Sequence, residues 1–291
     1  MKAPPLAYVR ATSLADAFRL WREAGPDARL LAGGQTLLAT LAFRLSDPGT
    51  LIDITRVAEL RGISTAGGAI RVGALTTHAE LGADELVARH VPLLAEAVPL
   101  IAHAAIRNRG TIGGSLAYAD PAAELPACAV CLDATIVARS ATGERRIPAG
   151  DFFTGLYATA LAEHELIAAV EFPAAQTGEH AAILELARRS GDYAMAGVVA
   201  KARVAIAALA EPKLVFFGVG DGPVVARRAM AALAGKPPTA EAIVAAQAAL
   251  DDDLNPASDQ HGGPEMKRQL ARVLLGRVVR RLSGTEEARA A

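Results

Sequence analysis

The sequence RNRGTIGGSLAYADPAAELP runs from Arg107 to Pro126 and carries most of the information about the fold. Its centre combines three glycines with two hydroxyl side chains: Gly110, Gly113, Gly114, Thr111 and Ser115. Because glycine has no Cβ, a ligand can approach its backbone closely, and successive exposed N–H groups can form a concave anion site. A single glycine pair is also typical of a plain turn. Alone, the stretch therefore indicates either a turn or a phosphate-binding loop.

A second glycine stretch, LLAGGQTLL, lies at 30–38, about 75 residues earlier. It interrupts a hydrophobic run with Gly33, Gly34, Gln35 and Thr36, so a hydroxyl side chain again follows the glycines. Two such loops favour a shared site for the pyrophosphate of a dinucleotide. The chain has neither a Gly-Lys-Ser/Thr phosphate loop nor a Gly-x-Gly-x-x-Gly fingerprint after a strand. The sequence therefore predicts a pyrophosphate held without a lysine.

The composition limits the classes of function. The 291 residues suit two or three small domains, and the 52% of hydrophobic residues allow well-packed cores. Thirty Lys and Arg face 31 Asp and Glu, which argues against a nucleic-acid or anionic-membrane surface. We read no signal peptide and no transmembrane segment. We expect a soluble cytoplasmic protein without a nucleic-acid partner, peripheral to the inner face of a membrane only through its complex.

The first 175 residues are predicted to mix short strands with helices. Ser13 or Thr12 caps an amphipathic helix that ends at Gly25. Thr77 opens a single helix, THAELGADELVARH, over 77–90. We find no regular βαβ rhythm, so the predicted fold class is α+β.

The composition changes after residue 175, which we take as a domain boundary. The segments AILELARRS, VAKARVAIAAL and KLVFFGVG predict an antiparallel meander. Helices are predicted at 224–234, 239–250 and 264–282. The last residues, 284–291, are expected to be a frayed tail.

Other candidate sites have simpler structural interpretations. Cys128 and Cys131 form a C-x-x-C pair, but they lie on a predicted apolar helix, and no second pair completes a four-ligand metal site. The six histidines are scattered and are interpreted as structural or exposed. The run 251–253, three aspartates, favours a solvated helix end over a cation site. Ser115 has no nucleophile-elbow context. We therefore predict no catalytic residue and no metal site in this chain.

In their long context, the two glycine stretches resemble the FAD-binding medium subunit of the molybdenum hydroxylases, the family of carbon monoxide dehydrogenase and xanthine dehydrogenase. The motifs are AGGQTL, RNRGTIGGSLAYADPAAELPA, HELIAAVEFP and RRSGDYAMAGVVA. The resemblance covers nearly the whole chain. It implies an FAD-binding domain of the vanillyl-alcohol-oxidase type at 1–175, with subdomains at about 1–55 and 56–175. A smaller C-terminal α+β domain with an antiparallel sheet and helices follows at 176–283.

The resemblance also implies FAD contacts, position by position. The first pyrophosphate loop is matched by Ala32, Gly33, Gly34, Gln35, Thr36 and Leu37. The second is matched by Thr111, Ile112, Gly113, Gly114 and Ser115. Glu124 matches an acidic residue that accepts hydrogen bonds from ribose hydroxyls, and Ile167 matches an apolar residue near the adenine or the flavin rim. Tyr193 matches a ring that lies over one face of the isoalloxazine.

Some positions depart from the family pattern. Glu185 stands where many relatives have a lysine close to the flavin, and a carboxylate there would disfavour an anionic reduced flavin. Tyr118 replaces a frequent histidine. Arg107 is interpreted as structural, whereas Arg109 is left open between phosphate binding and packing.

The family resemblance implies a role in electron transfer. Substrate is oxidised at a molybdenum cofactor in a separate large subunit, and electrons pass through two two-iron two-sulfur clusters of a small subunit to FAD in this chain. They leave to a quinone, NAD or oxygen. The implied assembly is a dimer of heterotrimers. Two alternatives remain: a self-contained FAD oxidase or dehydrogenase, and a non-enzymatic assembly or binding protein that has lost FAD.

Overall fold

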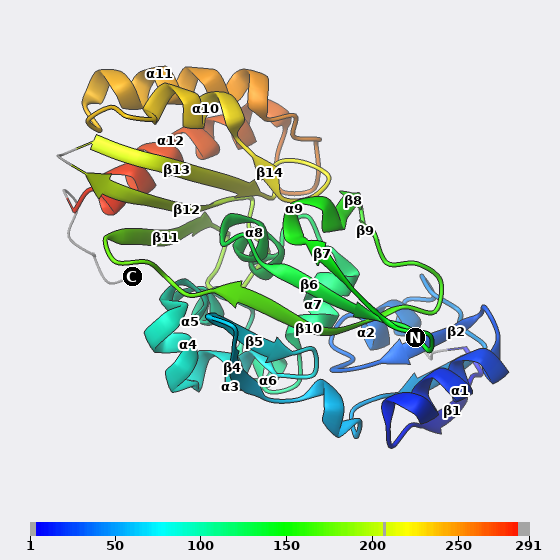
Figure 1. The fold of residues 1–291 in the computed structure, drawn as a ribbon. Coiled ribbons are helices and arrows are strands. Elements are labelled where there is room, and N and C mark those ends of the chain that lie inside the picture. Colours follow the sequence, from blue (N-terminus) through cyan, green and yellow to red (C-terminus); the bar gives the residue numbers. More distant parts are fainter. Residues whose placement is uncertain (1–3, 206–207, 285–291) are drawn as a thin grey trace.

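The computed structural model describes residues 4–205 and 208–284. Figure 1 shows three layered units that follow one another along the molecule, built on sheets of three, five and four strands. The N-terminal unit lies at one end and the C-terminal unit at the other. Of the frayed tail expected at 284–291, residues 285–291 lie outside the described residues.

The N-terminal unit is a small parallel sheet with two crossover helices. Its elements are β1 (Ala7–Arg10), α1 (Leu14–Ala24), β2 (Ala28–Leu31), α2 (Leu37–Ala42) and β3 (Thr50–Asp53). The strand order is β1-β3-β2, and both strand pairs are parallel. The prediction that the chain lacks a βαβ rhythm is therefore wrong for these residues. Strands of four residues are too short to show a distinct hydrophobic period.

Capping residues decide where the early helices begin and end. The Ser13 Oγ accepts a hydrogen bond from the Asp16 N–H at 3.1 Å, and Gly25 ends α1 with φ +78°, as predicted. Thr77 begins α3 (His78–Ala83) with a capping box. The single helix predicted from Thr77 is wrong, because Asp84 adopts an extended conformation and caps a new helix, α4 (Glu85–His90).

The middle unit is an antiparallel sheet in the order β4-β5-β10-β6-β7. Its strands are β4 (Ile63–Ala66), β5 (Ala69–Gly73), β6 (Thr135–Arg139), β7 (Glu144–Pro148) and β10 (Leu166–Pro173). The helices of this unit after α4 are α5 (Pro92–Ala97), α6 (Ala104–Arg107), α7 (Ile112–Tyr118), α8 (Glu124–Cys131) and α9 (Ala149–Phe152). Short elements complete it: η1 (Ala58–Leu60), η2 (Val98–Leu100), β8 (Phe153–Gly155) and β9 (Ala158–Thr159). Cys128 and Cys131 are fully buried free thiols on α8, as predicted, and burial raises the pKa of both.

The C-terminal unit has the predicted antiparallel meander. Its strands are β11 (Glu179–Leu186), β12 (Ala196–Ala205), β13 (Ala208–Phe217) and β14 (Val224–Val225). Its helices α10 (Arg227–Leu233), α11 (Ala240–Asp253) and α12 (Pro264–Leu282) pack together over one face of this sheet (Figure 1). α10 begins three residues later than the helix predicted at 224–234, because Val224 and Val225 pair with β13 instead.

The three aspartates at the end of α11 are engaged by protein groups. Asp253 accepts hydrogen bonds from the backbone N–H groups of Arg228 and Ala229, which begin α10. Asp251 forms an ion pair with Arg272. Across the described ranges, no group of three or more His, Cys, Asp or Glu residues is arranged to hold a metal ion.

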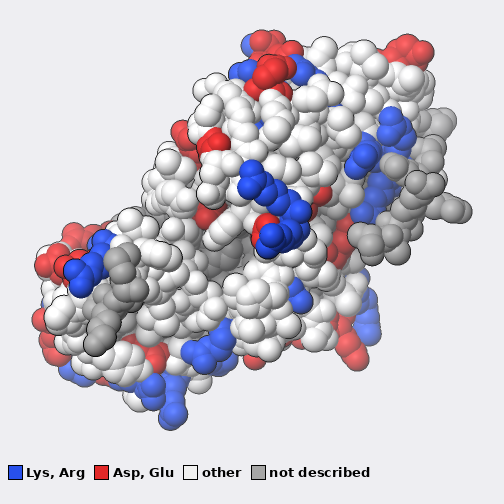
Figure 2. Space-filling view, turned by 180° about the vertical axis from the view of Figure 1, so that it is seen from behind, with Lys and Arg blue, Asp and Glu red and all other residues white. Residues whose placement is uncertain are grey.

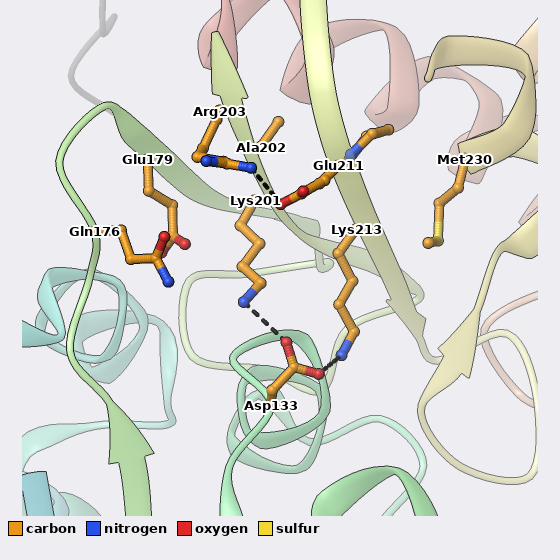
Figure 3. A pocket seen from close by; sticks show the side chains of 10 residues that line it. Asp133, Gln176, Glu179, Lys201, Ala202, Arg203, Glu211, Lys213 and Met230 are labelled. Atoms are coloured by element: carbon orange, nitrogen blue, oxygen red, sulfur yellow. Dashed lines mark hydrogen bonds and ion pairs between the residues drawn. The ribbon is translucent and has the colours of Figure 1, made fainter. Parts of the chain in front are cut away.

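The middle and C-terminal units share one hydrophobic core. Cys128 of α8 belongs to the same buried cluster as Val199 of β12 and Phe217 of β13. Beside this core, Asp133 binds both Lys213 and Lys201, the latter at 3.0 Å, across a pocket between the units (Figure 3). These contacts fix the relative position of the two units and therefore the shape of anything built at their junction.

Candidate functional site

A cavity of about 780 Å³ lies where the three units meet. Its lining comes from residues between 29 and 37, at 78, between 101 and 124, between 188 and 193, and at 260 and 261. The volume falls in the range of ligand pockets in proteins. The two glycine stretches thus lie on one cavity, together with parts of the C-terminal unit that are distant in sequence.

The two glycine stretches touch each other directly. A Cβ on Gly33 would overlap the carbonyl oxygen of Arg109 and lie 2.8 Å from its carbonyl carbon. On the other side of that peptide, a Cβ on Gly110 would lie 3.1 Å from the His78 ring. Gly33 is therefore required for contact between the loops.

The first stretch leaves its backbone donors open. Gly34 has φ +73°, which favours glycine, and it turns the chain from β2 into α2. The backbone N–H groups of residues 33–37 have no hydrogen-bond acceptor among the described residues. Thr36 precedes α2 without a side-chain capping bond, so its hydroxyl is also uncommitted. These groups together offer several donors to an anion.

The second stretch uses its backbone donors internally, because residues 112–118 form the helix α7. The N–H groups of Ile112 and Gly113 bind the carbonyls of Thr76 and Ala74 at 3.0 and 2.9 Å. The Gly114 N–H binds the Thr111 Oγ at 3.1 Å, and the Ser115 N–H binds the Thr111 carbonyl at 3.0 Å. The expectation of successive exposed N–H groups is therefore wrong for this stretch.

The glycines of α7 differ in their surroundings. A Cβ on Gly113 would lie 2.6 Å from the Ala74 Cβ, so Gly113 allows α7 to pack against the end of β5. A Cβ on Gly114 would meet only the Thr111 Oγ, at 3.0 Å, and Gly114 lines the cavity. Gly113 thus serves packing, whereas Gly114 keeps one side of the cavity clear.

Buried ionisable side chains surround the cavity. Glu124 is the first residue of α8, and burial raises its pKa to about 7. His78 is 6% exposed, neither of its ring nitrogens has a hydrogen-bond partner among the described residues, and burial lowers its pKa to about 4. His78 is therefore neutral at pH 7, and its ring carries one donor and one acceptor beside the Thr111 backbone.

Glu185 lies on β11 behind this wall rather than in the cavity lining. Its Oε2 is buried without a hydrogen-bond partner among the described residues. Burial, with the charge of Glu124 as a second cause, raises its pKa to about 8. Glu185, expected from the sequence to be a carboxylate near the flavin, is therefore mostly a neutral carboxylic acid at neutral pH.

Most of the residues predicted to bind cofactor line the cavity: Ala32, Gly33, Gly34, Gln35, Thr36, Leu37, Thr111, Gly114, Ser115, Glu124 and Tyr193. Ile112, Gly113 and Ile167 do not. Ile112 and Ile167 are buried in the core beside it.

Several lining residues were missed by sequence reasoning. The histidines were interpreted as structural or exposed, yet His78 and His261 line the cavity, as do Arg188 and Gln260. The position of His78 at the start of a capped helix was visible in the sequence, but its approach to Gly110 was not. Arg188, Gln260 and His261 reach the cavity only through the packing of the C-terminal unit.

Comparison with known proteins identifies the family. Residues 4–175 match the family described as FAD binding domain in molybdopterin dehydrogenase, and residues 181–282 match the CO dehydrogenase flavoprotein C-terminal domain. The chain belongs to the FAD-binding family of molybdopterin dehydrogenases. FAD is therefore the cofactor to which the cavity must be compared.

Relatives of this flavoprotein match it over nearly its full length. The 6-hydroxypseudooxynicotine dehydrogenase complex subunit alpha of Paenarthrobacter nicotinovorans is 38% identical, covering 96% of this chain and 95% of the relative. The carbon monoxide dehydrogenase medium chain of Hydrogenophaga pseudoflava is 35% identical over 100% of both chains. A solved structure of carbon monoxide dehydrogenase from Hydrogenophaga pseudoflava, which lacks the Mo-pyranopterin moiety, superposes with a TM-score of 0.95 at 36% identity, covering 98% and 99% of the two chains. The predicted α+β fold and family are confirmed.

The cavity of this flavoprotein fits FAD in its chemistry. The open N–H groups at 33–37 suit a pyrophosphate, and the cleared side of Gly114 admits it. Neutral His78 adds a buried donor and acceptor whose nitrogens meet no hydrogen-bond partner within the part of the chain that the structure describes. No helix within the described residues is long and apolar enough to span a bilayer. Figure 2 shows basic and acidic side chains interspersed over the face it draws.

Proposed function

We propose that this chain is the FAD-carrying medium subunit of a molybdenum hydroxylase-type dehydrogenase, in which it passes electrons from a partner's iron–sulfur clusters to an external acceptor. The observation that carries the proposal is the row of open backbone N–H groups at 33–37 on a cavity shared with Gly114. When bound, FAD supplies the redox chemistry. The chain then has to bind it, orient it and control its access to solvent.

In this proposal, the two glycine stretches have different tasks toward the pyrophosphate. The first, with Thr36, supplies hydrogen-bond donors. The second is held rigid by its own hydrogen bonds and presents Gly114 and the Ser115 side chain to the cavity. Ile112, Gly113 and Ile167 would act through packing, since they do not line the cavity.

The remaining predicted residues would orient the rest of the cofactor. Glu124 is buried in the wall, and with a pKa raised to about 7 by burial it can accept hydrogen bonds from ribose hydroxyls or donate one. Tyr193 lines the cavity yet is 58% exposed, so its ring lies at the mouth, where it can cover one face of the isoalloxazine. No side chain of this chain is assigned as an acid–base catalyst.

The partner proposal rests on relatives and on an exposed apolar surface. Relatives are named medium chains or medium subunits, which implies a large molybdenum-cofactor subunit and a small iron–sulfur subunit beside this chain. At the end of the first glycine stretch and just after it, three apolar side chains are exposed: Leu38, Phe43 and Leu45. Such a cluster is typical of interaction surfaces. We propose a dimer of heterotrimers in the cytoplasm, at the inner face of the membrane where its acceptor is a quinone.

The test is FAD content and electron transfer in the purified full chain and in its complex. We expect one FAD per chain, with flavin absorbance that bleaches on addition of the organic substrate only when both partner subunits are present. Oxidation of an organic substrate by the chain alone would instead establish a self-contained oxidase. A gently purified complex without FAD would establish an assembly protein.

A further inference from the structure

The loop between β11 and β12 brings Tyr193 to the mouth of the cavity. Its base is closed by a hydrogen bond from the Met195 N–H to the Leu186 carbonyl at 2.8 Å, and inside it the Asp192 N–H binds the Arg189 carbonyl at 3.1 Å. We call residues 187–193 the tyrosine loop. With Tyr193 mostly exposed, something other than burial of its own ring must hold the loop in place.

The tyrosine loop rests on the middle unit through Gly191. This glycine has φ +82°, and a Cβ there would lie 2.5 Å from the carbonyl oxygen of Ala102 and 2.9 Å from its carbonyl carbon. Backbone therefore lies against backbone at this contact. Ala102 itself has φ +42°, a left-handed conformation that is unfavourable for alanine. A neighbouring interaction has to maintain it.

Arg107 provides that interaction. Its Nη1 donates to the carbonyl oxygens of Ile101 and Ala102 at 2.8 and 2.9 Å. The Ala102 oxygen is the atom that Gly191 approaches from the other side. No carboxylate in the described residues forms an ion pair with Arg107, so its charge is directed at these two carbonyls.

We propose that Arg107 is a positioning residue for Tyr193: it fixes the Ile101 and Ala102 carbonyls as a seat for Gly191, and thereby holds the tyrosine loop across the mouth of the cavity. The link to FAD rests on the proposed function, whereas the link between Arg107 and the loop does not. Arg107 thus acts on the cofactor through two backbone contacts. The simpler alternative is that Arg107 only stabilises the turn before α6.

Hydrogen exchange in the full chain without FAD separates these possibilities. In Arg107→Met, the amides of Asp192 and Met195 should exchange about tenfold faster, while amides within β12 and β13 remain unchanged. Equal acceleration in the strands would show a general loss of stability and overturn the proposal, as would unchanged exchange at Asp192. Arg109→Met is the matched control, because Arg109 lies in the same stretch and its side chain is exposed.

A second variant approaches the seat from the other side. Gly191→Ala places a Cβ against the Ala102 carbonyl and should release the loop as Arg107→Met does. The double variant should release it no further than either single variant, because both break the same contact. Additive effects would overturn the proposal. If Arg107→Met does not fold, Gly191→Ala alone still tests the contact between the tyrosine loop and Ala102.

The cofactor arm uses the FAD dissociation rate of the loaded chain. Release should be about tenfold faster in Arg107→Met and Gly191→Ala, and unchanged in Gly143→Ala, where a new Cβ meets nothing within 4 Å. Faster FAD release without faster exchange at Asp192 would show that Arg107 acts on the cofactor directly and would overturn the proposal. If the wild-type chain binds no FAD, the proposed function fails, while the exchange arm still tests the seat.

Discussion

The two glycine stretches look alike in sequence, but the structure uses them in opposite ways. At 33–37 the backbone N–H groups have no acceptor among the described residues. At 112–115 every N–H group is bound within the chain, to carbonyls or to the Thr111 hydroxyl. The first stretch is therefore chemically open, whereas the second is a rigid element that shapes the cavity.

This difference shows that a Gly-Gly pair does not define a role by itself. Gly33 and Gly113 are required because protein backbone or side chain occupies the place of a Cβ. Gly34 is required for its positive φ. Among these four glycines, only Gly114 would bring a Cβ against a single atom, the Thr111 Oγ at 3.0 Å, and it lines the cavity. Substitutions at these positions should accordingly affect folding and cofactor binding to different degrees.

The largest effect is expected for Gly33→Ala. The new Cβ would overlap the Arg109 carbonyl oxygen and push the two stretches apart. We expect loss of FAD and a fall of about 1–3 kcal/mol in the free energy of unfolding. Flavin absorbance after purification and urea denaturation measure the two quantities. Gly143→Ala is the control, since a Cβ there meets nothing within 4 Å; an equal loss in both variants would refute the contact between the stretches.

Gly114→Val should separate cofactor binding from folding. The protein offers space for the side chain except at the Thr111 Oγ, so most of its bulk enters the cavity. We expect FAD affinity to fall about 100-fold or more, equivalent to ~3 kcal/mol. The FAD-free chain should lose much less stability than Gly113→Val, in which the side chain would enter the contact with Ala74. Titration with FAD measures the affinity; undiminished binding would contradict the assignment of Gly114 to the cofactor side.

The third prediction concerns the pH dependence of stability, because ionisable side chains lie near the second glycine stretch, whereas the first contains none. No ionisable side chain occurs between residues 30 and 43, whereas the second stretch leads to Glu124, with Glu185 behind it. Burial raises both pKa values, to about 7 and about 8, above the ordinary value of 4.5. Between about pH 4.5 and pH 8, these two groups therefore bind more protons in the folded chain than in the unfolded chain. Its stability should be highest below about pH 4.5 with respect to these groups and fall as pH rises to 8.

The measurement is the free energy of unfolding of the FAD-free chain between pH 5 and 8. Each group contributes at most about 1.4 kcal/mol per pH unit to the slope. Glu185→Gln keeps the shape of the side chain but cannot ionise, so the fall in stability between pH 5 and 8 should become shallower, while the contributions of Glu124 and His78 remain. An unchanged slope in this variant would show that Glu185 is not held in its neutral form.

The fold was predictable where a local signal was strong. The last helix has the predicted bounds, Pro264–Leu282, because a proline after two glycines marks its start and an apolar face runs along it. The N-terminal βαβαβ unit was not predictable from periodicity, since β1 and β3 have only four residues each. The division of the helix after Thr77 depended on Asp84, whose cap competes with helix continuation.

The site was predictable only in part, for a physical reason. Glycines and hydroxyls reveal a loop that can receive phosphate, and the family resemblance then assigned the cofactor. The protonation state of a side chain depends on its burial, which a single sequence does not specify. His78 and Glu185 are both polar residues in unremarkable surroundings of the sequence, yet one is a buried neutral imidazole and the other a neutral acid.

The smallest expected effects come from the two threonines that lie beside the glycines. The Thr111 hydroxyl accepts from the Gly114 N–H at 3.1 Å, so Thr111→Val should cost about 1 kcal/mol of stability through the lost cap. Thr36 makes no such bond. Thr36→Val should leave stability within about 0.5 kcal/mol of wild type.

FAD titration completes this test. Thr111→Val should have the larger effect on stability, whereas Thr36→Val should have the larger effect on FAD affinity. If the Thr36 hydroxyl donates to the pyrophosphate, Thr36→Val loses one hydrogen bond of about 1 kcal/mol, which weakens affinity about fivefold. Thr36→Ser and Thr111→Ser keep the hydroxyls and should restore both quantities. Similar responses of the two valine variants in stability and in affinity would mean that the stretches share one role. Opposite responses would show that the two stretches form different sides of one cofactor site. The first would supply free N–H groups and the second a helix start whose N–H groups are already bound.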